Sequence, residues 1–163
     1  MITRRTLLTA AAAGAVGIGL NWRPRPAAAA GDFPIKRSNE EWRKLLTPQQ
    51  YAVLRESATE RPFTSPLDKE KRRGTFACAG CEQELFSSTT KFESGTGWPS
   101  FWAPIADAAV GTERDTSLGM VRVSVHCSRC GGHLGHVFDD GPRPTGLRYC
   151  MNGVAMAFKP LAA

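Results

Sequence analysis

The stretch Met120-Val121-Arg122-Val123-Ser124-Val125-His126-Cys127 alternates between apolar and polar side chains. Successive side chains of a β-strand point to opposite faces of the sheet, so the three valines share one face and Arg122, Ser124 and His126 share the other. Alternation of this kind predicts a half-buried strand.

Similar but weaker patterns occur on both sides of this segment. Short apolar runs bounded by Gly, Pro, Asp or Ser predict strands at 74–77, 84–87, 134–138, 147–151 and 154–159, with turns at Gly141-Pro142 and Thr145-Gly146. No helical periodicity separates these runs. The fold class we expect is therefore mainly β, with antiparallel sheets packed as a small sandwich or barrel.

Two short helices are predicted before the strands. Ser38-Asn39-Glu40-Glu41 is a capping box, and Thr47-Pro48 combines an N-cap residue with a proline at the first helical position. The second helical pattern continues toward Pro62. The apolar residues expected on the buried faces are Trp42, Leu45, Leu46, Tyr51, Val53 and Leu54.

The first thirty residues have the features of an export signal. Arg4-Arg5 precedes an apolar run from Leu7 to Leu20, and Ala28-x-Ala30 offers a cleavage site before Gly31. The run has 14 residues, whereas a span of the bilayer needs about 20. We expect a twin-arginine-type signal peptide at 1–30, a single domain at 31–163 without a membrane anchor after cleavage, and a bacterial periplasmic location.

Composition and charge exclude several classes of protein. With 42% hydrophobic and 22% charged residues, the chain of 163 residues suits one compact core and not a disordered polymer or a coiled coil. The net charge is +6, but four arginines lie in the first thirty residues, which leaves +2 for the rest. The basic run at 69–73 contains Glu70 and has no interleaved aromatic residues, so we expect no nucleic-acid partner.

Four of the five cysteines form two CxxC motifs, Cys78-Ala79-Gly80-Cys81 and Cys127-Ser128-Arg129-Cys130. Two such turns can supply the four thiolates of a closed tetrahedral zinc site, with a folded insertion between them. We therefore expect structural zinc bound by Cys78, Cys81, Cys127 and Cys130. The alternatives are a pair of disulfides, a redox-active CxxC motif, or iron bound by the same four thiolates.

The fifth cysteine, Cys150, has polar neighbours. On a strand, Arg148, Cys150 and Asn152 would project from the same face, where the guanidinium would stabilise a thiolate. This row favours a reactive thiol over a buried inert one. His133 and His136 are either acid/base partners of Cys150 or solvated turn residues, because the four cysteines already complete one metal site.

These motifs resemble those of the B-type methionine-R-sulfoxide reductases. The resemblance covers about residues 36–160 and rests on the first CxxC, KFESGTGWPSF at 91–101, the second CxxC, HLGHVFDDGP at 133–142 and RYCMN at 148–152. It implies a distorted β-sandwich with the zinc site away from the active site. It also implies reduction of the R epimer of methionine sulfoxide, free or in oxidised proteins and peptides.

The resemblance also implies roles for individual residues. Cys150 would be the nucleophile and would become a sulfenic acid, and Trp98 would receive the substrate methyl group. The polar surroundings of the thiol would be His133, His136, Asp140, Arg148 and Asn152. Many members have a resolving cysteine just before Gly-Trp, but this chain has Thr96 there. Recycling would then need a small thiol or a thioredoxin-like protein. The alternative from a different class is a zinc-stabilised peptide-binding module without turnover.

Overall fold

The structure is a computed structural model that describes residues 32–162, so the predicted signal peptide at 1–30 lies outside the described residues. Both predicted helices are present, as α1 (Asn39–Leu45) and α2 (Pro48–Glu56). Ser38 and Thr47 are their N-caps, and each completes a capping box. The prediction was wrong about Leu45, which is exposed, and about the reach of α2, which ends at Glu56 where Ser57 adopts a left-handed conformation.

A three-stranded antiparallel sheet forms one layer of the fold. Its order is β2 (Glu84–Ser87), β1 (Gly74–Cys78) and β9 (Met156–Pro160), so the end of the chain pairs with the first strand. All three strands were predicted, although β9 begins two residues later than expected. A 3-10 turn, η4 (Gly153–Ala155), occupies the residues before it.

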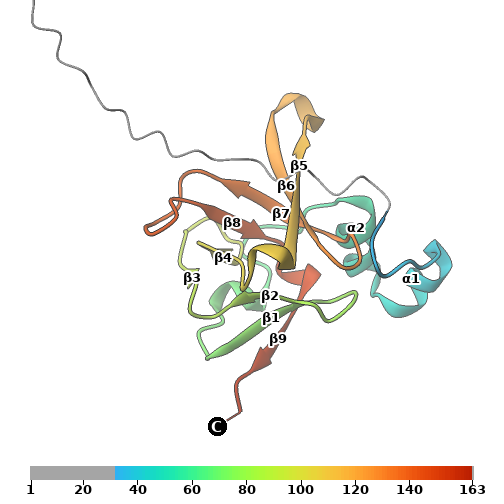
Figure 1. Cartoon of the computed structure of the whole chain (residues 1–163), viewed down its shortest axis with the longest axis horizontal. Helices are drawn as coiled ribbons and strands as arrows, with labels where there is room; N and C mark the ends of the chain where they lie inside the picture. The colour runs from blue at the N-terminus through green and yellow to red at the C-terminus, as the bar shows by residue number, and fades with distance from the viewer. Residues whose placement is uncertain (1–31, 163) are drawn as a thin grey trace, which may run out of the picture.

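A six-stranded antiparallel sheet forms the second layer (Figure 1). Its order is β3 (Lys91–Phe92), β4 (Ser100–Phe101), β8 (Arg148–Met151), β7 (His133–Phe138), β6 (Arg122–Cys127) and β5 (Val110–Asp115). The predictions included β6, β7 and β8 but missed β3, β4 and β5. Three further 3-10 turns are η1 (Pro66–Lys69), η2 (Asp107–Ala109) and η3 (Ser117–Gly119).

Aromatic side chains fill the core between the sheets. The Phe86 and Phe101 rings stack with centroids 4.4 Å apart, and Phe76 meets Phe101 edge-on at 4.9 Å. These rings come from β1 and β2 on one side and from β4 on the other, so their contact joins the two layers. The prediction of a mainly β fold with short N-terminal helices and a four-cysteine cluster is confirmed.

The burial of β6 differs from the simple prediction. Val121 and Val123 are exposed, whereas Ser124 and His126 on the polar face are buried. The reason is visible in Figure 1, where the β5–β6 hairpin projects beyond the body of the fold. The polar face of this strand therefore carries the groups described below. Among residues 32–162, no helix has the length and apolar character needed to cross a bilayer.

Candidate functional site

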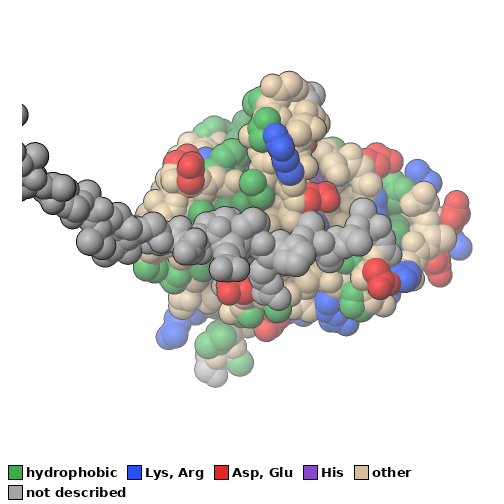
Figure 2. Space-filling view, turned by 45° about the horizontal axis from the view of Figure 1, so that its top comes forward, with side chains coloured by type: hydrophobic (Ala, Val, Ile, Leu, Met, Phe, Trp, Pro, Cys, Tyr) green, Lys and Arg blue, Asp and Glu red, His purple; other side chains and the backbone are tan. Residues whose placement is uncertain are grey.

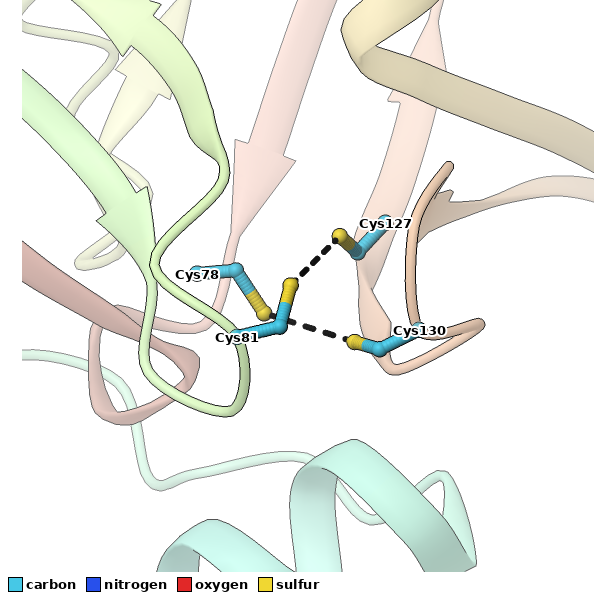
Figure 3. A group of neighbouring side chains, drawn as sticks. All are labelled: Cys78, Cys81, Cys127 and Cys130. Carbon is cyan, nitrogen blue, oxygen red and sulfur yellow. Dashed lines mark hydrogen bonds between the residues drawn. The ribbon is translucent and has the colours of Figure 1, made fainter. Parts of the chain in front are cut away.

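The two CxxC motifs bring their four sulfur atoms together. Figure 3 shows the side chains pointing toward a common centre from two loops, and all four Sγ atoms lie within 4.8 Å of one another. The Cys78 and Cys130 sulfurs are 3.7 Å apart, and those of Cys81 and Cys127 are 3.5 Å apart. Ligands of a tetrahedral zinc ion, with bonds of about 2.3 Å, are separated by about 3.8 Å. The four thiols therefore fit a metal site, and their separations are too long for disulfide bonds.

The cluster also connects the two sheets. Cys78 ends β1 of the smaller sheet, and Cys127 ends β6 of the larger one. Helix α2 packs beside the cluster, because Arg55 donates a hydrogen bond to the Cys130 carbonyl oxygen at 3.0 Å. Three of the four cysteines are buried, and Cys81 is partly exposed. A metal here would fasten the layers at one end of the fold.

Cys150 lies elsewhere, in the middle of the six-stranded sheet. Its Cα pairs with Ser100 on β4 and with His136 on β7, so these three side chains share one face of the sheet. The close approach of β7 and β8 depends on Gly135, where a Cβ atom would collide with the Cys150 carbonyl oxygen. The fold thus places Cys150 directly across from His136, one of the two histidines considered as its partners.

A loop of the GTGWPS motif covers this thiol. The Thr96 hydroxyl lies 3.8 Å from the Cys150 sulfur, and Ser94 links Thr96 to Ser100 through hydrogen bonds of 2.8 and 2.7 Å. Gly97, at φ 88°, has the left-handed conformation that lets the loop turn. Thr96 is therefore a direct neighbour of Cys150.

Asp140 holds Arg148 next to the thiol. Its carboxylate accepts two parallel hydrogen bonds of 2.8 Å from the guanidinium, which also lies 4.4 Å from the Phe138 ring centroid. Burial raises the pKa of Cys150, and the opposing effects of Thr96, Arg148 and Ser100 are smaller. Arg148 therefore favours the thiolate, as expected from the sequence, but burial has the larger effect on this thiol.

Alkylation measures this balance directly. At pH 7 we expect Cys150 to react slowly with iodoacetamide, and its rate should rise steadily toward pH 9 and above, because the thiolate is the reactive form. Arg148→Met should slow alkylation at pH 8 by roughly threefold or more, whereas Arg148→Lys should retain the wild-type rate. Alkylation of the Cys150→Ser variant gives the background rate that is due to the four cluster thiols. Equal rates for the Met and Lys variants would contradict this electrostatic role.

The two predicted histidines have different surroundings. His136 Nε2 lies 2.7 Å from Asp115 Oδ2, and this carboxylate also accepts a hydrogen bond from Arg122 at 2.7 Å. His133 packs edge-on against His136 with ring centroids 5.4 Å apart, and its buried Nε2 has no partner among the described residues. Burial and the neighbouring His136 lower the pKa of His133 to about 4. Asp115 was not among the residues singled out from the sequence.

Asn152 and Trp98 are joined through Glu60, which the sequence analysis also missed. Asn152 follows the end of β8, so the expected row of three polar side chains on one strand stops at Cys150. Its amide instead accepts from the Glu60 N–H at 2.9 Å and donates to the Leu134 carbonyl oxygen at 3.0 Å. The Trp98 indole donates to the Glu60 carbonyl oxygen at 3.1 Å.

The Glu60 carboxylate extends this connection to the residues after Cys150. It accepts hydrogen bonds from the backbone N–H groups of Gly153 and Val154 in η4. Burial raises the pKa of Glu60, against the lowering effect of these two N–H groups. Glu60 thus ties the loop carrying Trp98 to the end of β8. A glutamate in a loop without periodicity gave no signal of this role.

Trp42 and His126 lie in the interior of the fold. Trp42 is buried in the core, as expected, and His126 is buried against Phe33 with ring centroids 5.4 Å apart. Histidine side chains are visible in Figure 2 beside acidic surface at the foot of the β5–β6 hairpin. On this view, basic and acidic side chains of the described residues are interspersed.

Comparisons with known proteins give one consistent result. The SelR domain family matches residues 46–160. The chain is 53% identical over 128 residues to a peptide methionine sulfoxide reductase MsrB of Leptospira interrogans, covering 78% of this chain and 98% of that protein. MsrB proteins of Methanosarcina barkeri and Pseudomonas putida are 59% and 58% identical over 77% of this chain, covering 88% and 95% of their own lengths. The chain therefore belongs to the MsrB family of peptide methionine sulfoxide reductases.

Proposed function

We propose that this protein reduces the R epimer of methionine sulfoxide, in peptides or free, through nucleophilic attack by Cys150. The observation that carries the proposal is the position of this thiol, directly across from His136 and 3.8 Å from the Thr96 hydroxyl. The family membership supports the same reaction. The other four cysteines form the separate cluster, so one sulfur remains for chemistry.

The reaction is a two-electron exchange between two sulfur atoms. The Cys150 thiolate attacks the sulfoxide sulfur, and the oxygen of the S–O bond gains a proton as methionine leaves. The oxygen finishes on Cys150 as a sulfenic acid, so the cysteine sulfur is oxidised and the substrate sulfur is reduced. Arg148, held by Asp140, stabilises the thiolate before attack.

His136 is the better proton donor of the two histidines. It faces Cys150 across the strand pair, and the Asp115 carboxylate fixes its ring. His133 is buried, and its lowered pKa of about 4 makes it neutral near pH 7. We therefore assign proton delivery to His136 and a packing role to His133.

Two aromatic residues provide an apolar surface for the substrate. Trp98, which is two residues after Thr96, is partly exposed. Its indole N–H is fixed by a hydrogen bond to the Glu60 carbonyl oxygen. Phe63 is 66% exposed, and its backbone N–H donates to the Gly97 carbonyl oxygen at 2.7 Å. An S-methyl group beside a polar oxygen suits an indole wall next to a thiol.

The ion of the four-cysteine cluster is zinc in this proposal. Four thiolates with near-tetrahedral sulfur separations and no additional ligand position are typical of structural zinc. Zinc supplies a cross-link between the sheets and takes no part in sulfoxide chemistry. The function therefore needs no redox cofactor, and the reducing electrons come from Cys150 and then from an external thiol.

Recycling of Cys150 is expected to differ from that of members with a resolving cysteine. Position 96 is threonine, and we propose that the metal holds the other four thiols. Without reductant, one methionine should be released per enzyme, with a gain of one oxygen on Cys150 and no new intramolecular disulfide. Mass spectrometry after dimedone trapping measures this. A disulfide between Cys150 and a cluster cysteine, with metal release, would contradict the division of the cysteines.

Thr96→Cys is the matched variant for this prediction. The Thr96 side chain already contacts the Cys150 sulfur, so a thiol there should resolve the sulfenic acid as an intramolecular disulfide. The variant should then become a substrate for thioredoxin, and dimedone trapping should fall at least about tenfold. Thr96→Ser keeps a hydroxyl and should behave like the wild type.

We further propose that the protein works after export, with a small thiol or thioredoxin-like protein as reductant and oxidised proteins as substrates. Support comes from the Arg4-Arg5 motif and the apolar run that follows it. Cleavage before Gly31 would leave a periplasmic domain without an anchor. A mature N-terminus at Gly31 is the direct test.

Racemic peptide methionine sulfoxide tests the activity itself. With metal-loaded protein and dithiothreitol, half of the substrate should be consumed, and only the R epimer, with the S epimer as the internal control. The alternative, a peptide-binding module without turnover, predicts binding but no methionine. Consumption of neither epimer would reject the enzymatic proposal.

A further inference from the structure

Asp115 makes a contact that links a distant hairpin to the site. Asp115 ends β5, and its side chain reaches past β6 to His136 on β7, with 2.7 Å between Oδ2 and Nε2. Arg122 Nη2 donates to the same oxygen at 2.7 Å, and the Ser117 N–H donates to Oδ1 at 2.8 Å. The side chains of Asp115 and His136 are mostly buried, at 17% and 13% exposure. Both carboxylate oxygens are thus held in place.

The hydrogen bonds of this carboxylate decide the protonation pattern of the imidazole ring. Ser117, through its side chain and N–H, and then His136 hold the pKa of Asp115 well below its usual range, so the carboxylate stays ionised. An ionised carboxylate only accepts hydrogen bonds, and the His136 nitrogen facing it must therefore carry hydrogen. That leaves Nδ1 as the nitrogen that gains and loses a proton.

The groups around His136 define what else could affect its charge. Asp115 and Arg122 face it from β5 and β6, His133 lies on its own strand, and Cys150 and Arg148 lie on β8. Asp115 is the acidic group among them that contacts the ring. Arg122 shares the same oxygen and fixes the carboxylate in position.

We propose that Asp115 is a positioning residue for the reaction, which fixes the His136 ring with hydrogen on Nε2, so that Nδ1 delivers the proton to the sulfoxide oxygen. This inference rests on the proposed function, in which His136 is the proton donor. The carboxylate touches neither thiol nor substrate and acts only through the histidine. The end of β5 thereby contributes to the proposed proton delivery.

The principal test is Asp115→Asn in the metal-loaded full chain. We expect kcat for the R epimer to fall about 10- to 100-fold with little change in KM. Asp115→Glu, which keeps a carboxylate, should recover most of the lost kcat. The alkylation rate of Cys150, which does not depend on proton delivery, should stay at the wild-type value.

Glu113→Gln is the matched control, because Glu113 lies on the same strand two residues away and pairs with Ser124 rather than with His136. It should keep the wild-type kcat and KM. A wild-type kcat in Asp115→Asn would overturn the inference while leaving the proposed function intact. Absence of activity in the wild-type protein would instead reject the function.

A second measurement is made on the wild-type protein and does not depend on the folding of an Asp115 variant. Nitrogen-15 NMR of the wild-type protein, with His136 signals assigned by their loss in His136→Gln, reports which ring nitrogen carries hydrogen. The neutral ring should carry it on Nε2. A neutral ring with hydrogen on Nδ1 would overturn the proposal irrespective of any kinetic result.

Discussion

Cys150→Ser is expected to reduce turnover of the R epimer by at least about a thousandfold, because it removes the thiol that we propose attacks the sulfoxide sulfur. A serine oxygen cannot replace this thiol, because the reaction oxidises the nucleophile to a sulfenic acid and an oxygen atom cannot take up the substrate oxygen in that way. The measurement is methionine release from a peptide substrate with excess dithiothreitol, down to about one part in ten thousand of the wild-type rate.

The fold and the metal content of this variant should not change. Cys150 is only partly buried, it lies outside the four-cysteine cluster, and serine differs from cysteine by one atom. Zinc per chain and the melting temperature should therefore match the wild type. Residual activity above about one per cent, in protein shown by mass spectrometry to carry serine, would contradict the role of Cys150.

The strands were predictable where burial left a regular pattern in the sequence. β1, β2 and β7 show compact apolar runs, and the predicted segments nearly coincide with them. β3 and β4 have only two residues each, too few for a period to appear. β5 (Val110–Asp115) reads Val-Gly-Thr-Glu-Arg-Asp, because it lies at the sheet edge and has no buried residue.

The burial of β6 shows the limit of alternation as a guide. The pattern identified the strand but not how far along it each face is covered. Val121 and Val123 lie on a projecting hairpin, whereas Ser124, Val125 and His126, which belong to both faces, lie where the fold covers the strand. Periodicity gives the two faces of a strand, and only the tertiary arrangement decides which residues of each face meet protein.

The sequence could identify those candidate site residues that lie within continuous motifs. Cys150 and Arg148 lie in one such motif and His136 lies in another. The two strands that contain these motifs pair directly, so the three residues come close together. Asp115 and Glu60 could not be found this way, because one reaches across an intervening strand and the other acts from a loop about 90 residues before Cys150. Their contacts depend on side-chain reach in the folded protein, which single-sequence spacing does not encode.

Cys127→Ser should have the second large effect, on stability rather than on chemistry. Cys127 is fully buried where β6 meets the end of β1, so loss of its thiolate opens the connection between the two sheets. Binding of structural zinc contributes apparent free energies of about 10 kcal/mol or more, comparable to the whole stability of a typical domain. Arg55 on α2 also bonds to the Cys130 loop, and this contact should loosen with the cluster.

We therefore expect Cys127→Ser to bind less than about a tenth of the wild-type zinc and to melt at least about 15 °C lower, or not to fold at 25 °C. Calorimetry and metal analysis on reduced protein measure both effects, and Cys150→Ser is the control for loss of a thiol outside the cluster. Treatment of the wild type with a chelator should reproduce the destabilisation, because in our proposal the metal, and not the sulfur atom alone, joins the sheets. Equal melting temperatures with and without metal, with all thiols reduced, would contradict a structural zinc site. Because Cys150 and His136 are held by β7 and β8 of one sheet, any metal-free protein that stays folded should still form the sulfenic acid.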